Sequence, residues 1–225
     1  MAGHPKSEQE HNLRDGTISR VAQQKHDSER VSVFIDDEFA FGLTLDLAIA
    51  AGLKKGKPLT VEEQQTLLEK ERPHRAYAVA LHFVGYQPRT SSEVRRKLRR
   101  KGYDENLIED TIERLEQNHF LDDESFAASF VRSRFNGSGY GPSRLRADLI
   151  KKGVASQIID RALAEFQDEA DLKSKAQDLA ERRWKKLERE MDPFKRKKKL
   201  LDYLVRRGYD YGLARKVVEE MSAES

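Results

Sequence analysis

Three stretches of the sequence share one pattern: RRKLRRKGY at 95–103, RADLIKKGV at 146–154 and LDYLVRRGY at 201–209. With Gly102, Gly153 and Gly208 set as equivalent, apolar residues stand eight and four positions earlier, and two cations stand directly before each glycine. Apolar residues at that spacing lie on one face of a helix. Glycine adopts positive φ without strain and commonly ends a helix. Each stretch is therefore predicted to be a basic helix that stops at its glycine.

A second helix is predicted after each glycine, and a further helix before each basic one. Apolar residues recur five, ten and thirteen positions after the glycine in all three copies, which gives the second helix a buried face. The preceding helices are RAYAVALHFVG, DESFAASFVRSRF and DLKSKAQDLAERRWKKLERE. The glycines are 51 and 55 residues apart, which is long for two-helix repeats and suits units of three helices.

The N-terminal third of the chain has strand patterns instead. In RVSVFIDDEFAFGL at 30–43, alternating apolar residues stand on both sides of a turn-like acidic tripeptide, so a β-hairpin is predicted with Phe39, Phe41 and Leu43 on one face. TISRVAQQK at 17–25 alternates more weakly and adds to the sheet. Helices at 45–52 and 60–71 are expected to cover it, because a small sheet needs cover.

These patterns predict a mainly α protein: a tandem array of three three-helix units, extended and curved, with a small N-terminal β-hairpin-containing domain. The predicted divisions are a disordered N-terminus at 1–15, the small domain at 16–71, and three-helix units at 72–121, 122–168 and 169–225.

Composition supports an array with much surface per residue. Of 225 residues, 36% are charged and 37% are hydrophobic, and the charged fraction is well above the usual quarter. The chain has no cysteine, which excludes a disulfide scaffold and fits a reducing compartment. No apolar run is long enough for a secretory signal or a membrane span. We therefore expect a cytoplasmic protein with no membrane partner.

The most glycine-dense stretch, NGSGYGPSR at 136–144, admits two interpretations. Three glycines could cradle a phosphate, but a Walker loop needs a preceding strand and a GK[ST] ending, and neither is present. Pro142 instead suits the first position of a helix. The stretch is interpreted as a joint between two helices, at which units one and two can hinge.

Three segments of the chain resemble the RecX family of recombinase regulators. They are LDDESFAASFVRSRFNGSGYGPSRLRADLIKKGV, the preceding RTSSEVRRKLRRKGY and the hairpin RVSVFIDDEFAFGL, and the resemblance extends over roughly residues 17–221. Unit three departs most, being longer and more basic. The resemblance implies a protein that binds the RecA filament along its groove and curbs strand exchange, ATP hydrolysis and repressor cleavage in the SOS response. It implies no cofactor.

The residues give little sign of catalysis or metal binding. Asp122, Asp123 and Glu124 form an acidic cluster, but at a helix entry such residues cap free N–H groups and oppose the dipole. The six histidines show no zinc-ligand spacing, and no catalytic motif stands in a supporting context. No catalytic residue, metal site or cofactor is predicted.

The basic helices are the candidate interaction surface, although charge runs are often only solvated faces. Arginines at 95, 96, 99 and 100 recur at helical spacing and are expected to form a continuous cationic ridge. The predicted partner-binding residues are Arg95, Arg96, Arg99, Arg100, Lys101, Arg134, Arg144, Lys151, Lys152, Arg206 and Arg207.

Two alternatives stay open within this surface. Arg134 and Arg144 either face the partner or pair with Asp122, Glu124 or Asp148. Residues 182–199 carry ten cations against three anions, and Trp184 within them either stacks a nucleic-acid base or packs in a core.

Three functions follow from these patterns. The first is modulation of a RecA-type filament by a monomer that also binds single-stranded or duplex DNA weakly. The second is a standalone DNA-binding repeat protein with units like helix-turn-helix modules. The third is an interaction scaffold with no nucleic-acid role.

Overall fold

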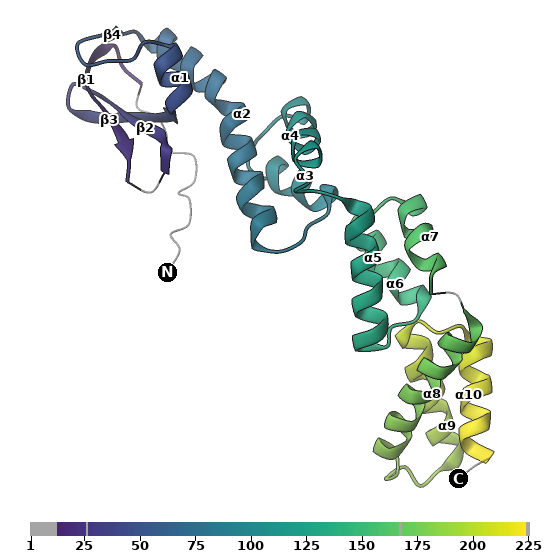
Figure 1. Ribbon diagram of the computed structural model, residues 1–225. Helices are drawn as coiled ribbons and strands as arrows, with labels where there is room; N and C mark the ends of the chain where they lie inside the picture. The colour runs from purple at the N-terminus through teal and green to yellow at the C-terminus, as the bar shows by residue number, and fades with distance from the viewer. Residues whose placement is uncertain (1–12, 26, 167, 224–225) are drawn as a thin grey trace. The chain divides into compact units, whose positions relative to one another are not determined.

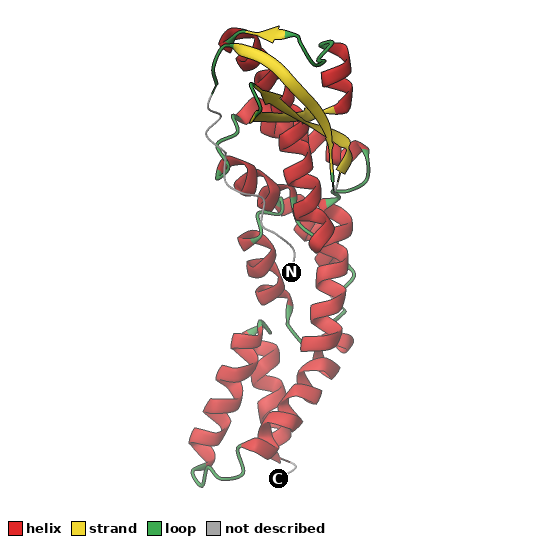
Figure 2. Cartoon of the chain, turned by 90° about the vertical axis from the view of Figure 1, so that its left-hand side faces the viewer, coloured by secondary structure: helices red, strands yellow, loops and turns green. Residues whose placement is uncertain are grey.

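The computed structural model describes residues 13–25, 27–166 and 168–223. The expected disorder at 1–15 therefore lies largely outside the described residues. By its internal contacts the chain divides into an N-terminal part up to Val79 and a helical part from Ala80 onward. Strands are confined to the first of these, and the rest of the described chain is helical (Figures 1 and 2).

The N-terminal part is an antiparallel four-stranded sheet of order β3-β2-β1-β4. Its strands are β1 (Gly16–Gln24), β2 (Asp27–Ile35), β3 (Glu38–Thr44) and β4 (Pro58–Leu59). Asp36 and Asp37 have φ of 47° and 67°, the positive values that a tight hairpin turn requires. The predicted hairpin is thus confirmed, whereas the two-residue β4 carries too little pattern to be seen in the sequence.

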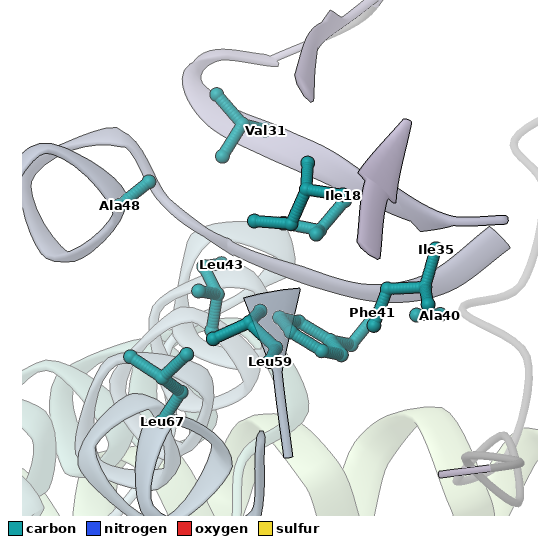
Figure 3. Packing of buried hydrophobic residues seen from close by; sticks show 10 residues of the cluster. Ile18, Val31, Ile35, Ala40, Phe41, Leu43, Ala48, Leu59 and Leu67 are labelled. Carbon is teal, nitrogen blue, oxygen red and sulfur yellow. The ribbon is translucent and has the colours of Figure 1, made fainter. Parts of the chain in front are cut away.

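One face of this sheet forms the core of the N-terminal part. Ile18, Val33 and Phe41 are fully buried there. Helices α1 (Leu45–Ala50) and α2 (Val61–Tyr86) contribute Ala48 and Leu67 (Figure 3). The alternation is broken at Phe39, because the β2–β3 register shifts between Val33 and Phe34.

The register shift places Phe39 on the outer face. Its side chain is 45% exposed and lies edge-on to Phe34, with the ring centroids 5.9 Å apart. Ala40 and Phe41 are both buried instead. The prediction that Phe39 shares a face with Phe41 and Leu43 is therefore wrong, because a bulge inserts one residue into the alternation.

Helix α2 (Val61–Tyr86) is longer than the sequence indicates. The predicted helices at 60–71 and in RAYAVALHFVG are one continuous helix that contains Pro73. Its N-terminus has the predicted capping box, in which the Glu63 amide donates to Thr60 Oγ1 and the Thr60 amide donates to Glu63 Oε2. Two residues before the proline, the buried Glu71 accepts hydrogen bonds from Arg30 and Thr44 of the sheet. These contacts tie the helix to the sheet.

Three sets of helices follow. Unit one consists of the end of α2 with α3 (Ser91–Arg99) and α4 (Glu105–Gln117). Unit two consists of α5 (Asp123–Ser133), a π-helical turn (Arg134–Ser138), α6 (Pro142–Lys151) and α7 (Ser156–Ala164). Unit three consists of α8 (Glu169–Lys186), α9 (Pro193–Arg207) and α10 (Tyr211–Ala223). We call α3, α6 and α9 the middle helices.

The glycine pattern sets the end of each middle helix. Gly102, Gly153 and Gly208 all have positive φ, of 81°, 78° and 95°, as predicted. The leucines four residues before them are fully buried. The residues six positions after each glycine, Ile108, Ile159 and Ala214, are fully buried. The residues five positions after each glycine, which were predicted to face the core, are only half-buried.

Candidate interaction surface

The four arginines of α3 do not form one continuous ridge. Arg95 makes two hydrogen bonds to the Glu109 carboxylate, at 2.7 and 2.8 Å, and Arg99 makes the same pair of bonds to Glu105. Both glutamates belong to the acidic helix α4 and, like the arginines, stand four residues apart. We call these two ion pairs the α3–α4 ladder. The ridge prediction is wrong for Arg95 and Arg99, because the chain's own acids neutralise them.

Arg96 and Arg100 lie outside this ladder. With Phe83, Arg89 and Glu93 they line an open cleft of about 640 Å³, which Arg99 also borders. The Arg89 guanidinium lies 4.2 Å from the centre of the Phe83 ring. Since Arg96 has no carboxylate partner among the described residues, this cleft is the cationic surface of unit one. Lys101 is half-buried at the end of the helix.

The junction between units one and two joins two middle helices end to end. Thr90 caps α3 by accepting the Glu93 amide, and its hydroxyl also donates to the carbonyl of Lys152 at the end of α6, at 2.7 Å. Lys152 Nζ is 3.2 Å from Glu93 Oε1. A carbonyl left unpaired at one helix end is thus satisfied by the start of another helix.

The junction between units two and three has the same form with closer backbones. The Gly141 amide donates to the Arg207 carbonyl at 2.8 Å, and the Ser143 amide donates to the Gly208 carbonyl at 3.1 Å. A Cβ added to Gly141 would lie 2.5 Å from the Gly208 backbone. The interpretation of NGSGYGPSR as a joint between two helices is therefore confirmed: the stretch connects α5 to α6 within unit two, and Gly141 lets the end of α9 pack against it.

Side chains reinforce this second junction. Arg207 donates to the Ser138 carbonyl at 2.7 Å, and the Tyr209 hydroxyl donates to the Gly139 carbonyl at 3.3 Å. Burial raises the pKa of Tyr209 to about 12, so the hydroxyl keeps its proton and remains a donor.

Cations and aromatic rings gather beside the second junction. The Arg144 guanidinium lies 3.9 Å from the centre of the Tyr140 ring, and that of Arg207 lies 5.5 Å from the same ring. Arg134 lies 5.6 Å from the centre of the Phe130 ring. We call the seven residues of this cluster the central surface: Phe130, Arg134, Tyr140, Arg144, Lys151, Lys152 and Arg207.

The central surface is open to a ligand. A shallow cleft of about 330 Å³ is lined by Phe130, Arg134, Tyr140, Asp148, Lys151 and Lys152. Arg134 and Lys151 are exposed and have no carboxylate partner among the described residues. Arrays of cations beside aromatic rings suit carboxylates, phosphates and stacked bases.

The structure also answers the pairing question for Arg134 and Arg144. Arg144 is 3.9 Å from Asp148 and donates to the Tyr140 hydroxyl and the Arg206 carbonyl. Arg134 pairs with neither Asp122 nor Glu124. Those acids act within the fold, since Asp122 caps α5 and Glu124 pairs with Arg161. Arg206 itself is exposed.

Sequence reasoning missed the aromatic half of this surface. Phe126 and Phe130 stand four residues apart and both lie within reach of Lys152 Nζ, at 5.2 and 6.0 Å from the ring centres. The signal was present as aromatic residues at helical spacing near the cations. The contact between Arg207 and Tyr140 could not be predicted from the sequence, because 67 residues separate them.

Two further absences hold for the described residues. No group of three histidine, aspartate or glutamate side chains is placed to hold a metal ion. No helix in the described ranges has the length and apolar character needed to cross a bilayer.

Comparison with known proteins gives the same division of the chain. Profiles of the RecX N-terminal domain and of the first, second and third RecX three-helix domains match residues 16–60, 76–115, 122–163 and 171–218. The regulatory protein RecX of Clostridium acetobutylicum is 33% identical over 215 residues, which covers 95% of this chain and 100% of the relative. That of Oceanobacillus iheyensis is 31% identical over 209 residues, covering 91% and 76%.

Two solved structures are also similar. A crystal structure of regulatory protein RecX has 26% sequence identity and a TM-score of 0.67, covering 93% of this chain and 99% of that one. The crystal structure of RecX from Lactobacillus salivarius has 27% identity and a TM-score of 0.60, covering 67% and 97%.

The ordered matches define a regulatory protein made of one N-terminal domain and three three-helix domains. The chain belongs to the RecX family, which confirms the resemblance. This is a family of regulatory proteins and not of enzymes, in agreement with the prediction of a protein without a catalytic site.

The α3–α4 ladder predicts a specific acid sensitivity. Hydrogen bonds from Arg99 and Arg95 hold the pKa values of Glu105 and Glu109 below their ordinary 4.5. A lowered folded pKa means that the ladder stabilises the fold above about pH 4.5 and is lost as the pH falls through the lowered values. The variant Glu105→Gln/Glu109→Gln should therefore have a lower Tm than the wild type at pH 7 and an equal Tm at strongly acid pH.

The control for the ladder is Asp110→Asn/Glu113→Gln, which removes the same charge from exposed positions of the same helix. Thermal unfolding between pH 2 and 7 should show a smaller Tm difference for it than for the ladder variant. A ladder variant whose Tm difference is independent of pH would contradict the assignment.

The second junction predicts a large cost for one methyl group. Gly141→Ala introduces no positive-φ strain but places Cβ against the Gly208 backbone, so we expect a loss of about 2 kcal/mol in unfolding free energy. The control is Gly137→Ala, four residues earlier in the chain, where the added Cβ would have open space around it. Denaturant unfolding gives the free energies, and hydrogen exchange at the Ser143 amide reports the junction directly. Equal stability of the two variants would rule out the close approach.

Proposed function

We propose that this chain modulates the RecA recombinase by placing the central surface of units two and three against the RecA filament. As a RecX regulatory protein it has RecA as its partner. The proposal adds the surface of contact and its consequence, which is inhibition or modulation of recombination, ATP hydrolysis and coprotease activity in DNA repair and the SOS response. We assign the protein to the bacterial cytoplasm, where that partner acts.

One observation carries the choice of surface. The contacts that join α9 to α6 also hold Arg207 and Arg144 around Tyr140, so the cations are ordered by the backbone of two units. Arg134 and Lys151 stand exposed beside them without carboxylate partners among the residues described. Preordered arginines lose less side-chain entropy on pairing with a carboxylate or phosphate.

Repetition suits a polymeric partner. The cleft beside α3 and the cleft beside α6 are both lined with cations and a phenylalanine ring, and they belong to successive units. Two linked contact sites on neighbouring protomers would bind at high effective concentration. A monomer of this chain is therefore sufficient for tight binding to a filament.

DNA alone is a weaker partner in this proposal. Nonspecific contacts to phosphates give Kd values of about 10⁻⁴ to 10⁻⁶ M at physiological salt. The net charge of the whole chain is only +3, and the ladder pairs two arginines of unit one with the chain's own acids. We expect weak, salt-dependent binding to single-stranded or duplex DNA.

The standalone helix-turn-helix alternative fits the structure less well. In such modules the last helix of the trihelical unit enters the major groove. In unit one that helix is α4, whose sequence ENLIEDTIERLEQ is acidic, and its Asp110 and Glu113 are exposed and lie outside the α3–α4 ladder. An acidic helix would be repelled by DNA phosphates.

The test is inhibition of RecA ATPase activity on single-stranded DNA. We expect substoichiometric inhibition by the wild type, and a loss of apparent affinity of roughly 10- to 100-fold in Arg134→Glu/Lys151→Glu, because two contacts become repulsive. The control is Lys70→Glu/Lys216→Glu, which makes the same charge change at exposed positions that are not part of the central surface. An equal loss in both variants would reduce the effect to net charge, and full inhibition by the first variant would exclude the central surface.

A further inference from the structure

The start of α9 differs from the starts of the other two middle helices. At the second helical position, α3 has Ser92 and α6 has Ser143, and both lie at a junction with the glycine-ended helix of the following unit. Ser92 stands against Gly153, and the Ser143 amide donates to the Gly208 carbonyl. In α9 this position is Phe194, which is 86% exposed. Met191, three residues earlier, is 90% exposed. We call these two residues the apolar tip of unit three.

The tip is not shaped for another unit. A Cβ on Gly153 would meet the Ser92 side chain, so even serine leaves no spare room at the first junction. A phenylalanine ring at the same position cannot fit such a close approach. A position used for docking in units one and two therefore carries exposed apolar side chains in unit three, which calls for a different ligand.

The surroundings of the tip are strongly cationic. Residues 182–199 carry ten cations and three anions. Two of the three anions act within the fold, since Asp192 caps α9 and Glu190 accepts a hydrogen bond from Lys199. Five cations of the segment make no ion pair, side-chain hydrogen bond or ring contact among the described residues: Lys185, Lys186, Arg189, Lys197 and Lys198. The charge selects an anionic ligand.

The Trp184 ring makes its contacts within the protein. It is half-buried and packs against the core of unit three, with the Arg196 guanidinium 3.8 Å from the ring centre and bonded to the Trp184 carbonyl. The core interpretation of Trp184 is thus confirmed, and the aromatic ring that the basic segment offers outward is Phe194.

We infer that the apolar tip and its cations bind single-stranded nucleic acid, with a base stacked on Phe194 and the phosphates beside the lysines. Stacking needs an unpaired base with a free face, which a single strand presents and a duplex does not. Two side chains give little area to insert into a bilayer. They also fall far short of the roughly 1,200 Å² of a stable protein interface, and two copies would repel each other.

The inference gives the proposed weak DNA binding a location, but it does not depend on RecA. The assay uses the full chain, a fluorescein-labelled 20-nucleotide thymidine oligomer at physiological salt, and no recombinase. Anisotropy measures affinity. Because the chain has a single tryptophan, its emission reports events in unit three.

We expect Phe194→Ser, which installs the residue of the other two units, to weaken binding roughly 5- to 150-fold. Phe194→Tyr should restore it. The control Tyr211→Ser removes an exposed aromatic side chain at the start of α10, beyond the other end of the 15-residue α9, and should leave affinity unchanged. Far-ultraviolet circular dichroism checks that each variant keeps its helices.

Three results would overturn the inference. The first is an equal effect of Phe194→Ser on an abasic oligomer of the same length, since stacking would then play no part. The second is a Phe194→Ser variant that binds the oligomer as tightly as the wild type but no longer binds vesicles of phosphatidylserine and phosphatidylcholine. The third is a Phe194→Ser variant with unchanged oligomer affinity but a different molar mass in sedimentation, which would indicate that the tip binds a second copy of the chain. If the wild type did not inhibit RecA but Phe194→Ser still weakened oligomer binding, only the proposed function would be contradicted.

Discussion

The helical part of this protein depends on how helix ends are satisfied. Each middle helix stops at a glycine with positive φ, and its last carbonyls need donors. In α6 and α9 those donors come from the start of the preceding middle helix: the Thr90 hydroxyl in one case, and the Gly141 and Ser143 amides in the other. Units two and three are therefore joined by backbone groups, and units one and two by a short hydroxyl side chain, whose geometries vary less than those of long side chains.

The same junctions determine where charge is available. At the end of α9, Arg207 reaches the Ser138 carbonyl and the Tyr140 ring, which creates an ordered surface of cations and aromatic rings. In α3, by contrast, Arg95 and Arg99 form ion pairs with Glu109 and Glu105. A run of cations in the sequence thus divides into an internal ion-pair ladder and an external surface, and only the external part can regulate a partner.

Local patterns predicted most of the fold, and long-range contacts decided what they could not. Glycine spacing gave the helix ends, and alternation gave the hairpin, because both depend on neighbouring residues. The bulge at Phe39 and the passage of α2 through Pro73 depend on tertiary packing that overrides local preference. The ladder required knowing which face of α4 turns toward α3, and the glycine joint required knowing that Gly208 lies against Gly141.

The second junction holds units two and three in one fixed arrangement. The chain has no cysteine, so Gln157→Cys/Lys216→Cys places two spin labels cleanly on exposed positions of α7 and α10. Pulsed electron–electron double resonance on the full chain should give a single narrow distribution of distances between the two labels. A broad or multimodal distribution would contradict the account, because it would mean that the two helix ends do not stay joined.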